Sequence, residues 1–182
     1  MNPSEEELLL QLSQPRSRSA AFSVVFRSYQ ERLYWHIRKM VLSHEDANDV
    51  LQNTFMKAWN GLEGFRGDSQ ISTWLYRIST NETLTFLSNK RMRSQNSIDE
   101  VEEGLLQNLR ADNYFNGNDL QLKLQKAILT LPEKQRLVFN MKYFDEITYN
   151  EMESILGTSV GALKASYHHA IKKIEKYFEE DE

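Results

Sequence analysis

The sequence predicts an all-α protein in which two small helical domains are joined by a flexible acidic linker. Only 7 Gly and 3 Pro occur among 182 residues, and Leu, Glu, Lys and Gln are frequent, which favours helix over sheet. Apolar side chains recur at three- and four-residue spacing on both sides of residues 94–119, whereas that segment is polar and has no such period. We therefore expect a helical bundle in 1–93, a linker in 94–119 and a four-helix domain in 120–182.

Three amphipathic helices are expected in the N-terminal domain. The first follows the apolar stripe of residues 22–41, and Ser43 is expected to cap the second, which continues to about residue 61. A loop with three glycines, residues 61–70, precedes a third helix from about residue 72 to about residue 90. That helix ends in a basic cluster of Lys90, Arg91 and Arg93.

Four helices are expected in the C-terminal domain. Pro132 suits the first turn of the second helix, and Thr148 with Glu151 forms a capping box for a short third helix. Gly157 suits a left-handed C-cap, and Ser159 caps a long last helix. A short helix, a glycine turn and a longer helix make up the helix-turn-helix signature.

Composition excludes several protein classes. The chain has no cysteine, so it forms neither disulfides nor thiolate metal sites, as suits a reducing compartment. Its acidic N-terminus lacks the basic and apolar regions of a signal peptide, and no apolar run approaches the ~20 residues of a membrane span. We expect a cytoplasmic protein that is not itself a membrane protein.

Charge is distributed unevenly along the chain, whose net charge is −4. Residues 1–93 carry a net +2, residues 94–119 a net −5 and residues 120–182 a net −1. Because phosphate neutralisation dominates affinity for DNA, neither end domain is expected to hold DNA tightly by itself.

The second predicted helix has a polar side opposite its apolar stripe. Two of its carboxylates, Asp46 and Asp49, stand three residues apart, as acid–base chemistry or a hard metal ion would require. No helix offers the matching Glu-x-x-His pattern of a di-metal bundle, which speaks against a metal. A solvated face and a protein-docking face both remain open. The polar side consists of Asp46, Asp49, Gln52, Asn53 and Met56.

The third predicted helix and the FRGDS loop before it suit single-stranded DNA. Tyr76, Arg77, Asn81 and Leu84 are expected off the core stripe. Aromatic and amide side chains beside basic ones can stack on bases and reach their edges. Glycine lets the loop backbone approach a ligand closely. The alternative is a surface loop and a helix end whose basic residues complement the dipole. Four aromatic residues are expected in the core rather than as stacking platforms: Phe55, Trp59, Phe65 and Trp74.

The last predicted helix presents a polar face that can enter the major groove of DNA. Ser, His and Lys side chains on it can donate to base edges or phosphates, although a plain αα-hairpin with a solvated face remains an equal alternative. His168 and His169 are neighbours and point to different sides, so no metal site is expected there. His36 and His44 also lack partners at metal-ligand spacing.

Taken together, four passages resemble the extracytoplasmic-function (ECF) RNA polymerase sigma factors, the smallest members of the primary-type sigma family. The first two resemble the family patterns D-x-x-Q-x-x-F-x-x-x-W and F-R-G-x-S-x-x-x-T-W-L-Y-R-I-x-x-N, and the last two resemble L-P-x-x-x-R-x-V-F and the helix-turn-helix. The passages are DANDVLQNTFMKAW (46–59), FRGDSQISTWLYRISTN (65–81), LPEKQRLVFNMKYFDEITYNEME (131–153) and ILGTSVGALKASYHHAIKKI (155–174).

The resemblance implies a factor that binds core RNA polymerase and directs initiation at −10 and −35 promoter elements, and it implies residue roles. Docking on the β′ clamp helices, with the β flap as a further contact, would use Asp46, Asp49, Gln52, Asn53 and Met56. Contacts to the −10 element would come from Phe65, Arg66, Asp68, Ser69, Tyr76, Arg77, Asn81, Lys90, Arg91 and Arg93. Contacts to the −35 element would come from Ser159, Lys164, Ser166, His168, His169 and Lys172.

Further roles follow from the same resemblance. A base flipped from the non-template strand would sit against the FRGDS loop and Asn81, and the acidic linker would thread polymerase channels that normally hold nucleic acid. An anti-sigma factor is implied as a regulatory partner. No catalytic residue, cofactor, metal or small-molecule substrate is expected.

The chain departs from the family pattern at two places. GALKAS (161–166) replaces the family's G-T-V-K/R-S-R, and His169 stands near the usual arginine, so −35 phosphate contacts are expected to be weaker. Thr85 stands where Asp or Asn is common, which affects −10 specificity. The rival functions are a stand-alone helix-turn-helix regulator and an enzyme using Asp46 and Asp49. The first lacks a basic domain or dimer seam, and the second lacks a convergent base or nucleophile.

Overall fold

The computed structural model describes residues 4–93 and 119–180 of the chain. Within these two stretches all regular elements are helical, so the predicted all-α class is confirmed. The predicted linker lies outside the described residues, apart from Asp119, which begins a helix.

The N-terminal part contains the three predicted helices and one more. α1 is absent from the sequence prediction, although its signal is present: the Ser4 hydroxyl accepts from the Glu7 backbone N–H at 3.2 Å, and the Glu7 carboxylate accepts from that of Ser4 at 3.0 Å. Ser43 caps α3, which is the second of the predicted helices, as expected, and its hydroxyl accepts from the Asp46 N–H. The elements are α1 (Glu5–Ser13), α2 (Arg18–Val41), α3 (His44–Gly61), the 3-10 turn η1 (Leu62–Gly64) and α4 (Ile71–Arg93).

The C-terminal part contains the four predicted helices, and its caps confirm the prediction. Thr148 and Glu151 form the capping box, Gly157 is left-handed at φ +65°, and the Ser159 hydroxyl accepts from the Ala162 N–H. Pro132 lies one position earlier than predicted, at the N-cap. The helices are α6 (Asp119–Leu129), α7 (Glu133–Tyr143), α8 (Tyr149–Leu156) and α9 (Val160–Glu179).

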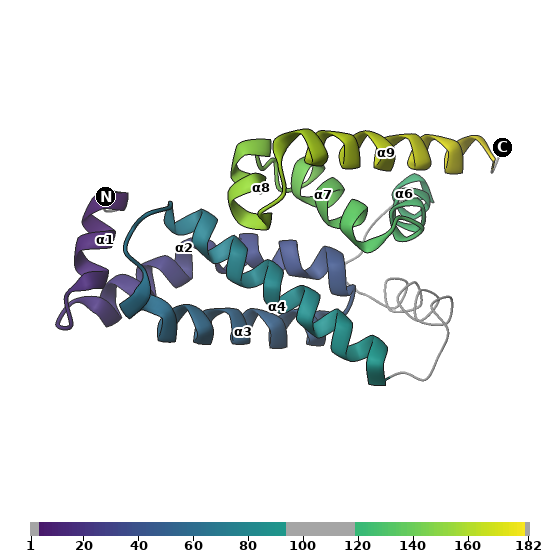
Figure 1. Cartoon of the computed structure of the whole chain (residues 1–182). Helices are drawn as coiled ribbons and strands as arrows, with labels where there is room; N and C mark the ends of the chain where they lie inside the picture. The colour runs from purple at the N-terminus through teal and green to yellow at the C-terminus, as the bar shows by residue number, and fades with distance from the viewer. Residues whose placement is uncertain (1–3, 94–118, 181–182) are drawn as a thin grey trace.

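The two parts form two layers that pack against each other (Figure 1). α2, α3 and α4 make one layer, and the C-terminal helices cross it so that α8 lies on α4 and α7 on α2. One continuous apolar core runs through both layers and includes Leu33, Met40, Met141 and Leu163. A second cluster, with Ile128, Phe139 and Ile174, fills the space among α6, α7 and α9. The predicted domains therefore share a buried interface in this conformation.

Two predictions about aromatic residues are wrong. Trp59 is 42 % exposed rather than in the core, whereas Phe55 is buried as predicted. Phe65 and Trp74 are partly buried and stack on each other with centroids 4.4 Å apart. Tyr76 is only 4 % exposed and not off the core stripe, because α4 packs on the N-terminal bundle on one side and on α8 on another. A helix covered from two sides buries more than one stripe.

Candidate functional site

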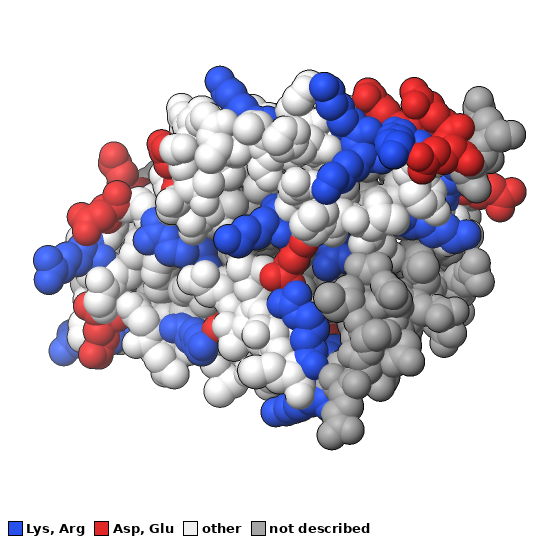
Figure 2. All heavy atoms as spheres, turned by 45° about the vertical axis from the view of Figure 1, so that its right-hand side comes forward, with Lys and Arg blue, Asp and Glu red and all other residues white. Residues whose placement is uncertain are grey.

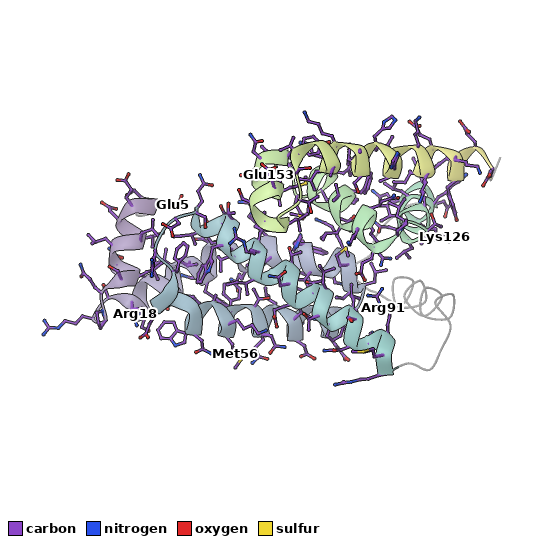
Figure 3. All side chains as sticks on the ribbon, viewed as in Figure 1. Glu5, Arg18, Met56, Arg91, Lys126 and Glu153 are labelled. Carbon is purple, nitrogen blue, oxygen red and sulfur yellow. The ribbon has the colours of Figure 1, made fainter. Side chains whose placement is uncertain are left out.

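The polar side of α3 is an open surface in the structure. Asp49, Gln52, Asn53 and Met56 are all exposed, and Met56 points away from the C-terminal layer (Figure 3). Met56 is 57 % exposed, and it gains meaning only together with a contiguous apolar patch beside it.

An apolar groove of about 470 Å³ lies between α2 and α3 beside this polar side. Its aromatic walls are interlocked, since Phe22 meets Trp59 edge-on at 5.2 Å and Phe26 meets Phe55 at 4.6 Å. Gln52 and Met56 line the groove as well, so groove and polar side form one surface. We call this surface the α3 face. Trp59 and Phe26 are half-exposed aromatic groups of the kind that anchor protein partners.

Asp46 differs from the other members of the predicted docking set. Its carboxylate is half-buried and forms an ion pair with Lys90 at 2.7 Å, which joins the start of α3 to the end of α4. This ion pair joins Asp46, which is predicted to bind polymerase, to Lys90, which is predicted to bind DNA.

The FRGDS loop is supported from below by α1, the helix that sequence reasoning missed. The Glu5 carboxylate accepts a hydrogen bond of 2.7 Å from the Ile71 N–H, the first amide of α4, and Figure 3 shows Glu5 beside that end of the helix. Gly67 adopts φ +76° with the Leu9 side chain beneath it. Because an acceptor at a helix N-terminus satisfies an amide that has no partner within the helix, Glu5 fixes where the loop ends and α4 begins.

The loop itself presents exposed polar groups above a rigid base. Arg66 and Asp68 are exposed, Ser69 is half-buried, and the stack of Phe65 on Trp74 lies beneath them. A rigid stack with donors and acceptors beside it can hold a nucleotide base.

The C-terminal layer contacts one side of α4 and engages some of its predicted site residues. Burial and the nearby Asp145 carboxylate raise the pKa of Tyr76 to about 12, and the Arg77 guanidinium donates to the Ser154 carbonyl of α8 at 2.6 Å. Asn81 is exposed. At the end of α4, Arg91 pairs with Glu133 of α7 at 3.0 Å, while Arg93 is exposed. Of the α4 residues predicted to act together, Tyr76 is thus buried, Arg77 and Arg91 are exposed but bonded to the C-terminal layer, and Asn81 and Arg93 are exposed.

A buried polar cluster ties the two layers together next to Tyr76. The Asp145 carboxylate, from the turn between α7 and α8, meets His36 Nδ1 at 2.7 Å and Lys39 Nζ at 2.5 Å. His36 is fully buried, and its Nε2 lies 3.0 Å from the Thr80 hydroxyl. Burial raises the pKa of Asp145, but the hydrogen bond with His36 and the charge of Lys39 outweigh it and leave the pKa below its ordinary value. His36 and Asp145 are 109 positions apart, so no sequence spacing could reveal the pair.

The helix-turn-helix holds its second helix by burying Leu163 and Ala170, which leaves the opposite side of α9 open. Lys164 lies 5.8 Å over the Tyr149 ring, and the rings of His168 and His169 are 6.3 Å apart. The predicted −35 residues on the open side are Ser159, Lys164, His168, His169 and Lys172, whereas Ser166 is half-buried. Figure 2 shows basic side chains over both layers and acidic ones gathered where α9 ends.

Two findings concern groups that the described residues do not contain. Across 4–93 and 119–180, no three His, Asp or Glu side chains gather in a way that could hold a metal ion. In the same part of the chain, no helix combines the length and apolar character needed to cross a bilayer.

Comparison with known proteins supports the same organisation. Residues 25–93 match the Sigma-70 region 2 family, and residues 121–174 match the Sigma-70 region 4 family. The RNA polymerase sigma factor YlaC of Bacillus subtilis is 30 % identical over 156 residues, covering 84 % of this chain and 88 % of that protein. The ECF RNA polymerase sigma-E factor of Escherichia coli K12 is 29 % identical over 163 residues, covering 85 % of each.

Two solved structures share the fold. CnrH, in complex with the cytosolic domain of CnrY, has a TM-score of 0.71 at 20 % identity and covers 98 % of this chain and 99 % of that chain. The sigma factor RpoE of Bartonella quintana, in complex with the anti-sigma factor NepR, has a TM-score of 0.65 at 22 % identity and covers 88 % and 98 %. The matching families name the wider group as sigma-70, a more accurate term than primary sigma. The chain belongs to the ECF RNA polymerase sigma factors, which bind core polymerase and direct promoter-specific transcription.

Proposed function

We propose that residues 1–93 bind core RNA polymerase and recognise and melt the −10 element, that 94–119 link the domains, and that 120–182 recognise the −35 element. The α3 face is the observation that carries this proposal. It combines an apolar groove with exposed polar groups, and it lies on the side of the bundle away from the C-terminal helices. It is therefore free to dock on another protein in the conformation described.

Core binding by the α3 face uses Asp49, Gln52, Asn53 and Met56, with the β′ clamp helices as the expected partner. Asp46 contributes indirectly, through its ion pair with Lys90. The double variant Asp49→Ala/Gln52→Ala is expected to lose co-purification with core polymerase and run-off transcription. Glu175→Ala, an exposed change on α9, serves as the control. Full core binding by the double variant would overturn the assignment.

Recognition of the −10 element is assigned to the FRGDS loop and α4. Arg66, Asp68 and Asn81 are the exposed groups that can read a flipped base over the Phe65–Trp74 stack. Arg77, Arg91 and Arg93 are exposed as well, Arg77 and Arg91 while bonded to the C-terminal layer, whereas Tyr76 is buried. Asn81→Ala and Asp68→Ala holoenzymes are expected to open promoters slowly and to tolerate substitutions in the −10 element. Unchanged discrimination in both would contradict the role.

Recognition of the −35 element is assigned to the open side of α9. Its reading set contains one half-buried serine and two histidines where charged donors would hold phosphates more firmly. We expect His169→Arg to strengthen −35 binding and its salt dependence, measured by holoenzyme footprinting. An unchanged salt slope would count against a phosphate contact at this position.

The chain is also proposed to have an anti-sigma partner and to act in the cytoplasm, without chemistry of its own. The support is the class of protein to which it belongs and the complexes formed by its structural relatives CnrH and RpoE. A stand-alone regulator is less favoured, since residues 120–182 carry a net charge of −1.

A further inference from the structure

We propose that a cavity between α1 and the FRGDS loop holds a second unpaired base of the non-template strand, and that this base is guanine. The inference rests on the −10 role proposed for the FRGDS loop, and it adds a site beside the Phe65–Trp74 stack. α1 lies outside residues 25–93, which match the Sigma-70 region 2 family, so the family match gives this helix no role.

The cavity measures about 350 Å³, which lies within the ~300–1,000 Å³ range of small-molecule sites. Its apolar part comes from Leu9 and Leu12 of α1 and from Leu62 of η1. Its polar part includes Arg18 of α2 and Glu63 of η1, and Figure 3 shows Arg18 at the end of the bundle beside α1. An apolar wall with a few polar groups at its edge suits the flat face and the polar edge of a nucleobase.

Phe65 joins the cavity to the proposed −10 site. Its ring stacks on Trp74 with centroids 4.4 Å apart, and it also lines the cavity. The next two loop residues, Arg66 and Gly67, line the cavity as well, and Gly67 has φ +76°, a conformation that favours glycine. Because successive nucleotides are covalently linked, a strand with one base on the Phe65–Trp74 stack has a neighbouring nucleotide beside the cavity.

Arg18 and Glu63 supply the cavity with a donor and an acceptor next to each other. Arg18 Nε donates to the Leu12 carbonyl at 3.1 Å, and Arg18 Nη1 donates to the Glu63 carboxylate at 3.2 Å. The Arg18 side chain is 23 % exposed and the Glu63 side chain 82 % exposed. The guanidinium is therefore held in place by α1, whereas the carboxylate lies in solvent and can turn toward a bound molecule.

This pairing of groups selects a base over a phosphate, and guanine over the other bases. A carboxylate repels a phosphate, so Glu63 favours the edge of a base in the cavity. The Watson–Crick edge of guanine places the acceptor O6 next to two donors, N1–H and the N2 amino group, which match an arginine donor beside a carboxylate. Adenine, cytosine and thymine each offer the carboxylate only one donor group on that edge. Unpaired bases are read on this edge because no partner strand occupies it.

The lifetime of open complexes on a pre-melted promoter tests the proposal in the holoenzyme. Replacing each non-template base in turn by an abasic site identifies the positions that are held, and each of these then receives guanine or adenine. We expect one position where the guanine complex lives about tenfold longer. Glu63→Gln is expected to remove most of this preference, whereas Glu6→Gln, an exposed carboxylate of α1 that does not line the cavity, keeps it. Equal preferences in the two variants, or a preference for another base, overturn the proposal.

Filling the cavity provides a second test that leaves the Arg18–Glu63 pair in place. Ser13 lines the cavity and is exposed, so Ser13→Trp can place an indole where the base would lie. We expect this variant to lose the guanine preference at the same position. Gln14→Trp, at the exposed neighbour that does not line the cavity, is the matched control, and circular dichroism verifies that both variants fold. A folded Ser13→Trp variant that keeps the preference would refute the site.

The same promoters separate failure of the cavity from failure of the proposed function. Asp68→Ala and Asn81→Ala act on the first base, so unchanged discrimination at the −10 element in both would refute the −10 role of the loop. If both reduce that discrimination while no position responds to Glu63→Gln, the cavity proposal alone fails. A loss of core affinity in Glu63→Gln with the guanine preference intact would assign the cavity to protein docking and also overturn the proposal.

Discussion

α3 and α4 are neighbours in one helical bundle, but the structure treats their outward faces in opposite ways. The α3 face is open, with Met56 57 % and Trp59 42 % exposed, whereas α4 carries Tyr76 at 4 % and an Arg77 bonded to the opposite layer. The proposed polymerase contact therefore needs no rearrangement of the described conformation. On α4, Tyr76 is buried, whereas Arg77, although bonded to α8, is itself exposed. We expect the α3 face to act as it stands and Tyr76 to contribute to packing in this conformation.

The largest effect is expected at the α3 face, as a loss of affinity for core polymerase. Trp59→Ala removes the aromatic wall of the groove, and an interface anchor of this type contributes about 2 kcal/mol or more, so core affinity should fall at least about thirtyfold. Trp35→Ala is the matched control, because Trp35 is also 42 % exposed but does not line the groove. Titration of labelled sigma factor into core polymerase measures both. Equal losses in the two variants would remove the groove from the docking surface.

The next largest effect is on the stability of the fold, and it concerns the buried cluster around Asp145. Asp145 has a pKa below its ordinary value, so its ionised form stabilises the folded state above the unfolded carboxyl pKa, and this contribution is lost as pH falls through the lowered pKa. Asp145→Asn should therefore cost about 3 kcal/mol near neutral pH and progressively less below about pH 4. Denaturant unfolding of the parent chain and of Asp145→Asn from pH 3 to 7 measures this difference. A difference in the free energy of unfolding that stays constant with pH would contradict the role of the Asp145 carboxylate. The groups facing Asp145 are His36, Lys39, Arg32, Tyr76, Glu146 and Glu151.

A smaller effect is expected where α1 supports the FRGDS loop. Glu5→Ala removes the acceptor for the first amide of α4, a loss comparable to that of a helix cap at about 1 kcal/mol. The loop should loosen, so that open-complex formation slows while core affinity stays unchanged. Glu6→Ala, an exposed change in the same turn, is the control. Normal open-complex formation by Glu5→Asp would support positioning of the loop by the carboxylate. Normal open-complex formation by Glu5→Ala would refute it.

The smallest effect is expected at the ion pair that joins the two helices. Lys90 is partly exposed, so Lys90→Met should cost less than about 1 kcal/mol. If Lys90 acts only through Asp46, Asp46→Asn and Lys90→Met will have the same small effect and leave the salt dependence of promoter binding unchanged. A shallower salt slope in Lys90→Met alone would identify a direct phosphate contact.

Local signals in the sequence are sufficient to predict most of the helices of the fold. Caps at Ser43, Thr148, Gly157 and Ser159 were readable because each acts within about one helical turn. The same kind of signal at Ser4 and Glu7 marks α1, but a nine-residue helix with few buried residues leaves a weak apolar period. The polar side of α3 was also readable, since exposed and buried residues alternate with the helical period.

The sequence by itself determined the helices, the division into two helical parts and the family, because these depend on short-range periodicity, capping and ordered motifs. Only the tertiary structure decided which surface is available. Tyr76 is buried, Arg77 is engaged and Asp46 is paired with Lys90 because elements remote in the chain pack there. The Asp145 cluster draws its members from positions 36, 39, 80 and 145. Such contacts arise from the packing of two layers, and no local sequence pattern predicts them.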